Sequence, residues 1–105
     1  MKKAAEKVTA VIELKITPAK DTGFAKIAQR IAKFPQVDAC FLMSGAYDLL
    51  VFVSGKSLQE VAHFVSAELS TIDGVLSTAT HFMRKTYKAK GLLAEFASDN
   101  RLPVV

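Results

Sequence analysis

Cysteine, tryptophan, glycine and proline are scarce in this chain of 105 residues. It has one cysteine, no tryptophan, five glycines and three prolines. A single cysteine, Cys40, excludes an internal disulfide and a cysteine-rich zinc site, and its apolar surroundings favour a small buried side chain. Because half of the residues are apolar and glycine and proline are few, the composition excludes a disordered or low-complexity chain. The glycines stand singly at turn positions, which excludes a glycine-rich phosphate loop.

Long apolar runs are lacking as well. The longest contains five consecutive apolar residues, whereas a helix needs about 20 to cross a bilayer. The basic start of the chain is not followed by the apolar stretch of a signal peptide. We therefore expect a cytoplasmic protein without membrane contact. The length suits one domain with one core, without room for a separate DNA-reading domain. The net charge of +4 permits a polyanionic partner but does not require one.

Apolar periodicity predicts two similar halves, each with the order strand, helix, strand. The predicted strands are 8–16, 37–44, 47–54 and 75–87, and the predicted helices are 24–33 and 58–72. Asp21 and Thr22 are candidate caps of the first helix, and Ser57 with Glu60 forms a capping box for the second. Right-handed crossovers on one sheet then give an α+β, ferredoxin-like βαββαβ sandwich. In it, a four-stranded antiparallel sheet carries both helices on one face.

The second and third strands are apolar on both sides. In the second, Val37, Ala39, Phe41 and Met43 alternate with Cys40 and Leu42; in the third, Leu49, Val51 and Val53 alternate with Leu50 and Phe52. Since two helices cover only one face, the other face predicts a homo-oligomer that dimerises through its sheets. In the second helix, Phe64 lies off the apolar stripe, and we expect a single exposed aromatic, with contact to a neighbouring subunit as the alternative. That predicted stripe is Leu58, Val61, Ala62, Val65 and Leu69.

Candidate catalytic groups are few. His63 is predicted on the polar side of its helix and His81 on a face of the last strand, and neither has a carboxylate or cysteine neighbour in sequence. No metal-ligand spacing occurs. We predict no catalytic residue, no metal site and no cofactor. An RNA-binding module shares the strand order, but the third strand lacks its basic and aromatic signature. Lys26, Arg30 and Lys33 are interpreted as a solvated basic helix face.

The segments 44–48 and 74–80 carry the candidate ligand chemistry. Asp48 opens an otherwise apolar strand, where a carboxylate is costly unless it is solvated or paired. It is either a turn acid that bonds local amides or part of a small-ligand site at the sheet edge. In such a site Asp48 would bind an ammonium group. Turn amides and the hydroxyls of Thr78 and Thr80 would bind a carboxylate or a polar side chain.

These segments resemble the effector-binding (RAM) domain of the Lrp/AsnC, or feast/famine, transcriptional regulators. The matching motifs are Gly45-x-Tyr47-Asp48 at the start of an apolar strand, Gly74-Val75, and Thr78-x-Thr80. The resemblance covers about 8–88 and implies the same fold, pairing of domains through their sheets, and rings of dimers, commonly octamers. It also implies an amino-acid effector bound between dimers. The implied effector-binding residues are Gly45, Tyr47, Asp48, Thr78 and Thr80.

We divide the chain into a flexible segment 1–7, a ligand-binding domain 8–88 and a C-terminal extension 89–105 that packs on its own domain or on a neighbour. It resembles the stand-alone family members without a helix-turn-helix, so direct DNA binding is not expected. The sequence thus predicts a non-enzymatic, oligomeric sensor of an amino acid or similar effector, which acts by co-assembly with a full-length Lrp/AsnC regulator. Alternatives are a dimeric α+β barrel enzyme, with His81 or His63 in a cavity between helices and sheet, and a scaffold that only assembles.

Overall fold

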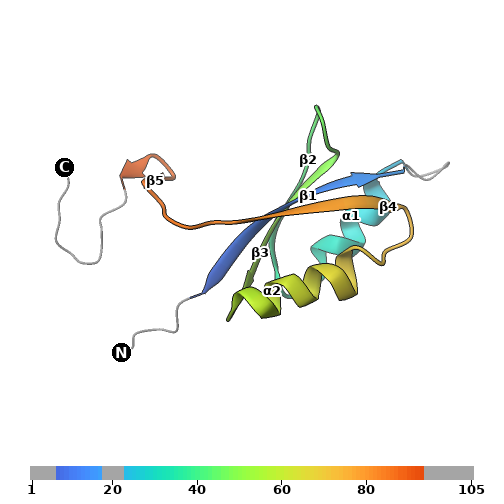
Figure 1. Ribbon diagram of the computed structural model, residues 1–105. Coiled ribbons are helices and arrows are strands. Elements are labelled where there is room, and N and C mark those ends of the chain that lie inside the picture. The colour runs from blue at the N-terminus through green and yellow to red at the C-terminus, as the bar shows by residue number, and fades with distance from the viewer. Residues whose placement is uncertain (1–6, 18–22, 94–105) are drawn as a thin grey trace.

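The computed structural model describes residues 7–17 and 23–93 (Figure 1). The elements are β1 (Val8–Ile16), α1 (Ala25–Ala32), β2 (Val37–Leu42), β3 (Leu49–Gly55), α2 (Leu58–Phe64), the π-helix η1 (Val65–Leu69), β4 (Val75–Phe82), β5 (Lys88–Ala89) and β6 (Leu92–Leu93). The predicted order of four strands and two helical segments is confirmed, followed by a small additional hairpin. Asp21 and Thr22 lie outside the described residues. No helix among the described residues is long and apolar enough to span a membrane.

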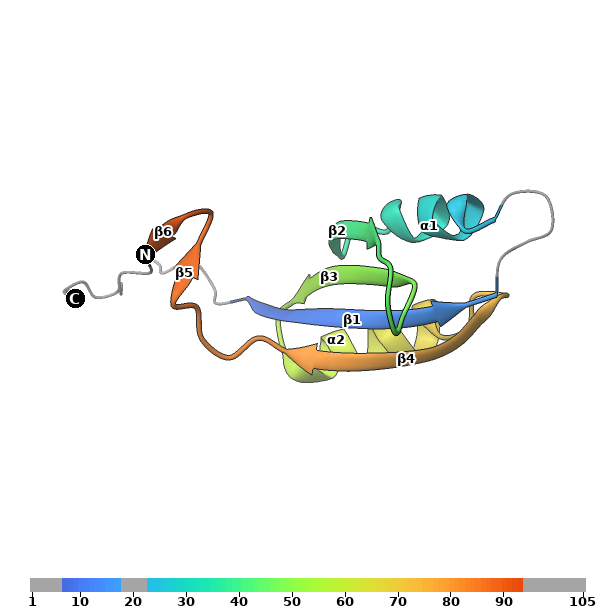
Figure 2. The same ribbon diagram turned by 90° about the horizontal axis from the view of Figure 1, so that it is seen from above.

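The main sheet has the strand order β2-β3-β1-β4, with every neighbouring pair antiparallel. The two consecutive halves of the chain are thereby interleaved, since β1 lies between β3 and β4. The helices lie on one face, and the opposite face is uncovered (Figures 1 and 2). This is the predicted α+β ferredoxin-like arrangement.

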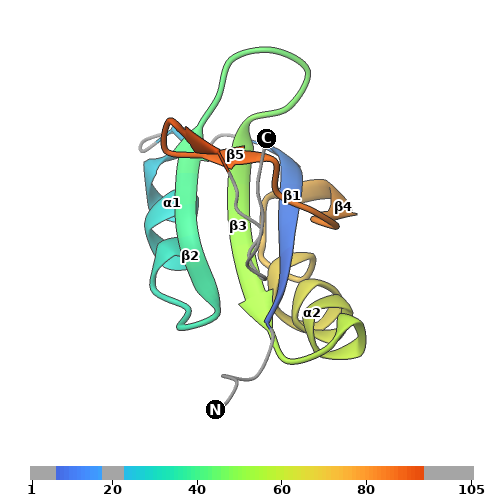
Figure 3. The ribbon, with the colours of Figure 1, turned by 90° about the vertical axis from the view of Figure 1, so that its left-hand side faces the viewer.

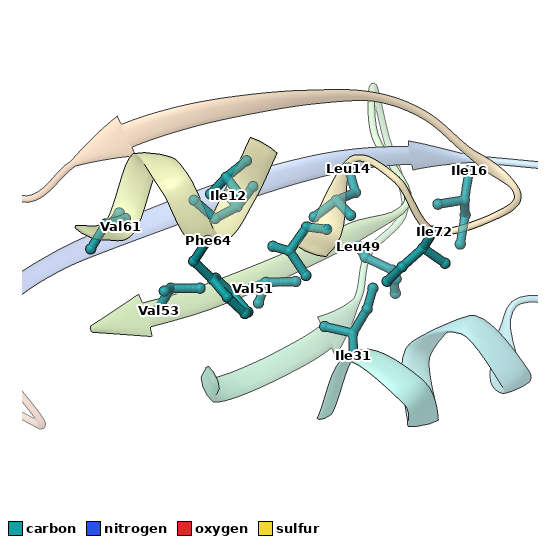
Figure 4. Packing of buried hydrophobic residues seen from close by; sticks show 13 residues of the cluster. Ile12, Leu14, Ile16, Ile31, Leu49, Val51, Val53, Val61, Phe64 and Ile72 are labelled. Carbon is teal, nitrogen blue, oxygen red and sulfur yellow. The ribbon is translucent and has the colours of Figure 1, made fainter. Parts of the chain in front are cut away.

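The core lies between the helices and the sheet (Figure 4). Alternation along β1 and β3 sends every second side chain into it, as the period of two requires. The capping box at the start of α2 is also present: the Glu60 backbone N–H donates to Ser57 Oγ at 3.0 Å, and the Lys56 N–H donates to Glu60 Oε1 at 3.1 Å. The buried cluster consists of Ala10, Ile12, Leu14, Ile16, Ile31, Leu49, Val51, Val53, Val61, Phe64, Val65, Leu69 and Ile72.

The expectation that Phe64 is an exposed aromatic is wrong. Phe64 is only 4% exposed, and its ring packs edge-to-face on Phe34 with centroids 5.2 Å apart. Conversely, Leu58 and Ala62, which we placed on the buried stripe, are exposed. A helical wheel could not show this because the covering ring of Phe34 comes from the segment that follows α1. The buried stripe of the second helical segment is therefore rotated about the helix axis toward Phe64, relative to the prediction.

The second helical segment changes type along its length. After α2, the chain continues as the π-helix η1, in which the Ser70 N–H donates to the Val65 carbonyl at 2.8 Å. A π-helical turn spans one residue more than an α-helical turn. Val65 and Leu69 are nevertheless both buried, so the widened turn keeps the apolar face on the sheet.

The prediction that Val37 and Ala39 lie on the same face of β2 is wrong, because the strand contains a β-bulge. Val37 is opposite Val53, whereas Ala39 is opposite Phe52, so the register shifts at Asp38. Val37 consequently packs against the core instead of sharing a face with Ala39. The Ser54 hydroxyl donates to the Asp38 carboxylate at this bulge.

Three strands are each shorter than predicted at one end. β4 ends at Phe82 rather than near residue 87, and its last contact with β1 is the 2.8 Å bond from the Met83 N–H to the Thr9 carbonyl. β2 ends at Leu42 and β3 begins at Leu49, so the connection between them, 43–48, is longer than a tight turn. The chain beyond β4 leads to the β5–β6 hairpin, which begins at Lys88, the last residue of the predicted domain, and continues into the predicted extension.

Candidate ligand site at one end of the sheet

Asp48 is anchored to the end of β1. Its carboxylate Oδ2 accepts a 2.9 Å hydrogen bond from the Ile16 backbone N–H, and its own N–H donates to the Leu14 carbonyl at 2.9 Å. The acid thus has a structural role, but the amide that it bonds belongs to a neighbouring strand rather than to its own turn. A carboxylate has about four acceptor positions, so this bond alone does not exhaust its capacity to accept hydrogen bonds. The Asp48 side chain is half-buried.

Gly74 is anchored to the same end of β1 from the opposite side. The Thr17 N–H donates to the Gly74 carbonyl at 2.8 Å, and Ile16 is opposite Val75 in the sheet. Gly74 has φ +97°, and a Cβ there would lie 2.8 Å from Ile27 Cδ1, so both backbone and space favour glycine. The two motifs of the sequence therefore converge on one short stretch, 16–17.

The loop 43–48 carries the remaining residues of the first motif. Gly45 has φ +134°, and a Cβ at this position would meet nothing within 4 Å. Figure 3 shows the loop projecting beyond the ends of β2 and β3. Tyr47, where the loop returns to the sheet, is half-buried. The loop thus presents its backbone and the Tyr47 side chain at the margin of the molecule.

Thr78 and Thr80 lie on the edge strand β4 and are half-buried. They are opposite Leu14 and Ile12, so their side chains share the helix-bearing face of the sheet. β1 separates them from Asp48, and two strand spacings amount to about 10 Å. Asp48 and the two threonines thus lie on strands that are not neighbours in the sheet.

A crevice opens elsewhere, between α1 and the turn before β4. Its volume is about 750 Å³, and none of the five predicted site residues lines it. Three cations that we interpreted as a solvated face lie along it with helical spacing. Sequence periodicity indicated the basic face but not the opposite wall, which comes from a distant turn. The lining residues are Thr17, Lys26, Ile27, Gln29, Arg30, Lys33, Ile72, Asp73 and Gly74.

The sheet surface away from the helices, called the open face below, is largely apolar as predicted. Phe41 and Phe52 meet edge-to-face with centroids 6.1 Å apart, and Phe41 is 51% exposed. The register aligns side chains from all four strands in two rows across this face. The open face comprises Val11, Glu13, Ala39, Phe41, Leu50, Phe52, Ala79 and His81.

Neither histidine lies in a cavity between helices and sheet. His63 is exposed on α2, and His81 lies on the open face with Nε2 3.3 Å from Glu13 Oε2. The sequence did not reveal this carboxylate neighbour because Glu13 belongs to β1, and diagonal pairs form only when strands associate. Over 7–17 and 23–93, no three His, Cys, Asp or Glu side chains are grouped so that they could hold a metal ion.

Comparison with known proteins identifies relatives of this fold and these motifs. The family model of the Lrp/AsnC ligand binding domain matches residues 9–93. The chain is 48% identical over 100 residues to YugG of Bacillus subtilis, an uncharacterized HTH-type transcriptional regulator, covering 95% of this chain and 60% of YugG. It is 34% identical over 86 residues to the uncharacterized HTH-type regulator PH0140 of Pyrococcus horikoshii, covering 82% of this chain and 52% of PH0140. The chain thus spans between half and two thirds of these regulators.

Solved structures of known proteins share this fold. The transcriptional regulator NMB0573 of Neisseria meningitidis, solved as an L-Met complex, has a TM-score of 0.69 and 28% identity over 81% of this chain and 55% of that one. TTHA0845 of Thermus thermophilus has a TM-score of 0.69 and 24% identity over 78% of this chain and 99% of that one, which supports the fold. YugG, PH0140 and NMB0573 are all described as transcriptional regulators. The chain belongs to the Lrp/AsnC ligand-binding domain family.

Proposed function

We propose that this regulatory, non-enzymatic domain senses an amino acid or a similar small effector that it binds between subunits. The observation that carries the proposal is the convergence of the two motifs on 16–17, beside a loop that projects from the molecule. Asp48 supplies an anionic acceptor for an ammonium group. The loop at Gly45 and Tyr47 supplies backbone amides for a carboxylate.

In the proposed site, a second copy completes the binding surface. Because Asp48 and the loop 43–48 are continuous in the chain, we assign the α-ammonium group of the ligand to Asp48 and its α-carboxylate group to the loop amides of the same copy. Thr78 and Thr80 then bind the ligand's distal side chain or reach the ligand of a neighbouring copy. The L-Met complex of the related NMB0573 is consistent with an amino-acid effector.

The open face supports a homodimer with two stacked sheets. Phe41 is exposed and packs on the half-buried Phe52, and burying such apolar surface provides the main driving force of association. We further propose that dimers assemble into a ring, octameric as the family resemblance implies, and that the domain co-assembles with a full-length Lrp/AsnC regulator. A region that covers 60% of the regulator YugG matches this chain, and such a region is a candidate partner surface for co-assembly.

Isothermal titration calorimetry with each of the 20 amino acids tests effector binding. We expect at least one to bind and expect Asp48→Asn to weaken it by at least about 10-fold, because the ammonium loses a charge-assisted partner. Glu68→Gln is the matched control: it removes one exposed carboxylate from η1, far in the fold from loop 43–48. If no amino acid binds, or if Asp48→Asn binds like the wild type, the effector proposal is wrong.

Sedimentation velocity at micromolar concentration tests the assembly. We expect a dimer or a larger ring, and we expect Phe41→Asp to release monomers because it places a charge in the aromatic pair of the open face. A monomeric wild-type protein would contradict the proposed assembly. A ring whose size and stability are unaffected by every amino acid would instead favour the scaffold alternative.

A further inference from the structure

The turn of the β5–β6 hairpin has a backbone conformation that favours a hairpin. Lys88 is opposite Leu93, and Ala89 is opposite Leu92, which leaves a two-residue turn. Lys90 has φ 53° and Gly91 has φ 78°. Positive φ at both central residues is the conformation of a type I′ turn, whose twist matches that of the two strands. The turn chemistry therefore favours a formed hairpin at this point of the chain.

Within 7–17 and 23–93, no other part of the chain covers this hairpin. Every residue from 83 to 93 is exposed, with Tyr87 at 74%, Leu92 at 72% and Leu93 at 66%. We call this segment the arm. An isolated two-stranded hairpin is at best marginally stable in water, and strands of two residues have very few hydrogen bonds to hold them. An apolar surface beyond these described residues would therefore stabilise the arm.

The position of the arm indicates which surface that is. It extends past the end of β4 and lies on the opposite side of the sheet from α2, which is the side of the open face (Figures 1 and 2). A second copy stacked on the open face would therefore come within reach of the arm. The exposed Phe41, which packs on the half-buried Phe52, shows that this face has accessible apolar surface.

Charge favours contact of each arm with the partner's body rather than with the partner's arm. The arm contains Arg84, Lys85, Lys88 and Lys90 and no acidic residue. Two such arms repel each other, whereas the open face carries one carboxylate, the half-buried Glu13 beside His81.

We infer that the arm packs on a second copy of this chain, with Tyr87, Leu92 and Leu93 covered by the partner's sheet. This inference rests on the homodimer of the proposed function and adds to it a specific element that clasps the partner. The dimer is then held by two reciprocal arms as well as by the stacked sheets, as two-fold symmetry requires.

Substitution of both leucines tests the arm. In Leu92→Ser/Leu93→Ser, we expect the dimer dissociation constant from sedimentation equilibrium to rise about 100-fold or more, because two leucine side chains per arm lose their buried contacts. The matched control is Leu76→Ser, an equally exposed leucine at 68% that lies near the opposite end of β4. This control should leave the dissociation constant unchanged. Since every residue of the arm is exposed, the far-ultraviolet circular dichroism of the double variant should equal that of the wild type.

Photo-crosslinking provides a second readout. A benzophenone amino acid in place of Leu92 should give a covalent dimer, and mass spectrometry should locate the crosslinked residue on the sheet of the partner. A dimeric protein whose double variant associates as tightly as the wild type, or whose crosslinks are all within one chain, would overturn the arm contact alone. A wild-type protein that is monomeric would overturn the proposed homodimer, and the arm contact with it.

Discussion

Removing the Asp48 carboxylate should destabilise the fold whether or not a ligand is present. In Asp48→Ala, the Ile16 N–H loses its partner at 2.9 Å, in a part-buried position at the end of β1. The backbone bonds of Asp48 to Leu14 and Met43 do not depend on its side chain and should persist. The substitution therefore isolates one charge-assisted hydrogen bond that joins β1 to the start of β3.

The magnitude follows from the type of bond. Hydrogen bonds to charged groups contribute about 1.5–3 kcal/mol, and a buried donor left without a partner costs a comparable amount. Because this position is only part-buried and water can reach it, we expect a loss of about 2 kcal/mol. For a domain of this size, that loss lowers the midpoint of thermal unfolding by about 10 °C.

Urea unfolding followed by circular dichroism measures this loss, at one fixed protein concentration because association shifts apparent stability. Asp48→Asn is the matched variant: its amide oxygen accepts from Ile16 without charge, so we expect a loss of about 1 kcal/mol. A difference below about 0.5 kcal/mol between Asp48→Ala and the wild type would refute the structural role of this carboxylate. Comparison with the calorimetry then separates loss of fold from loss of effector binding.

Three further predictions concern other positions. Gly74→Ala should cost about 1–3 kcal/mol in the free energy of unfolding, because φ is +97° and the new Cβ would lie 2.8 Å from Ile27 Cδ1; an unchanged urea midpoint would contradict this. Leu14→Ala, at a fully buried position, should cost about 2–5 kcal/mol in the same assay, and a loss below 1 kcal/mol would argue against the described core. Burial raises the pKa of the Cys40 thiol, so a smaller fraction of it is thiolate at pH 8. Iodoacetamide should therefore alkylate Cys40 more slowly in the native protein than in the unfolded chain. Equal alkylation rates would contradict the burial of Cys40.

The sequence predicted those parts of the fold that follow from local repetition. Alternating apolar residues in β1 and β3 and the Ser57–Glu60 capping box are local signals, and the structure contains them where expected. The features that were missed depend on partners far away in the chain. Phe64 is buried because Phe34 covers it, and Val37 faces the core because a bulge shifts the register of β2 against β3.

The arrangement of the candidate site also depends on contacts between residues far apart in the chain. Its residues could be chosen from two motifs, and the structure brings those motifs together at 16–17. The bond from the Ile16 N–H to Asp48 could not be foreseen, because it crosses from one strand to the next. The distance between Asp48 and Thr78 likewise follows only from the strand order, in which β1 intervenes. Residue identity thus suggests the candidate residues, whereas the topology of the sheet sets how they are arranged.

The π-helix η1 has a consequence for chain length. It accommodates one extra residue while both of its ends keep their side chains on the core. Deleting one of the exposed residues 66–68 would turn it into an α-helical turn, and Leu69 and Ile72 would still face the sheet. A deletion within α2, by contrast, would rotate every later side chain of the helix by about 100°. We therefore expect natural variation in the length of this helix, by one residue, to be tolerated at η1 and not one turn earlier.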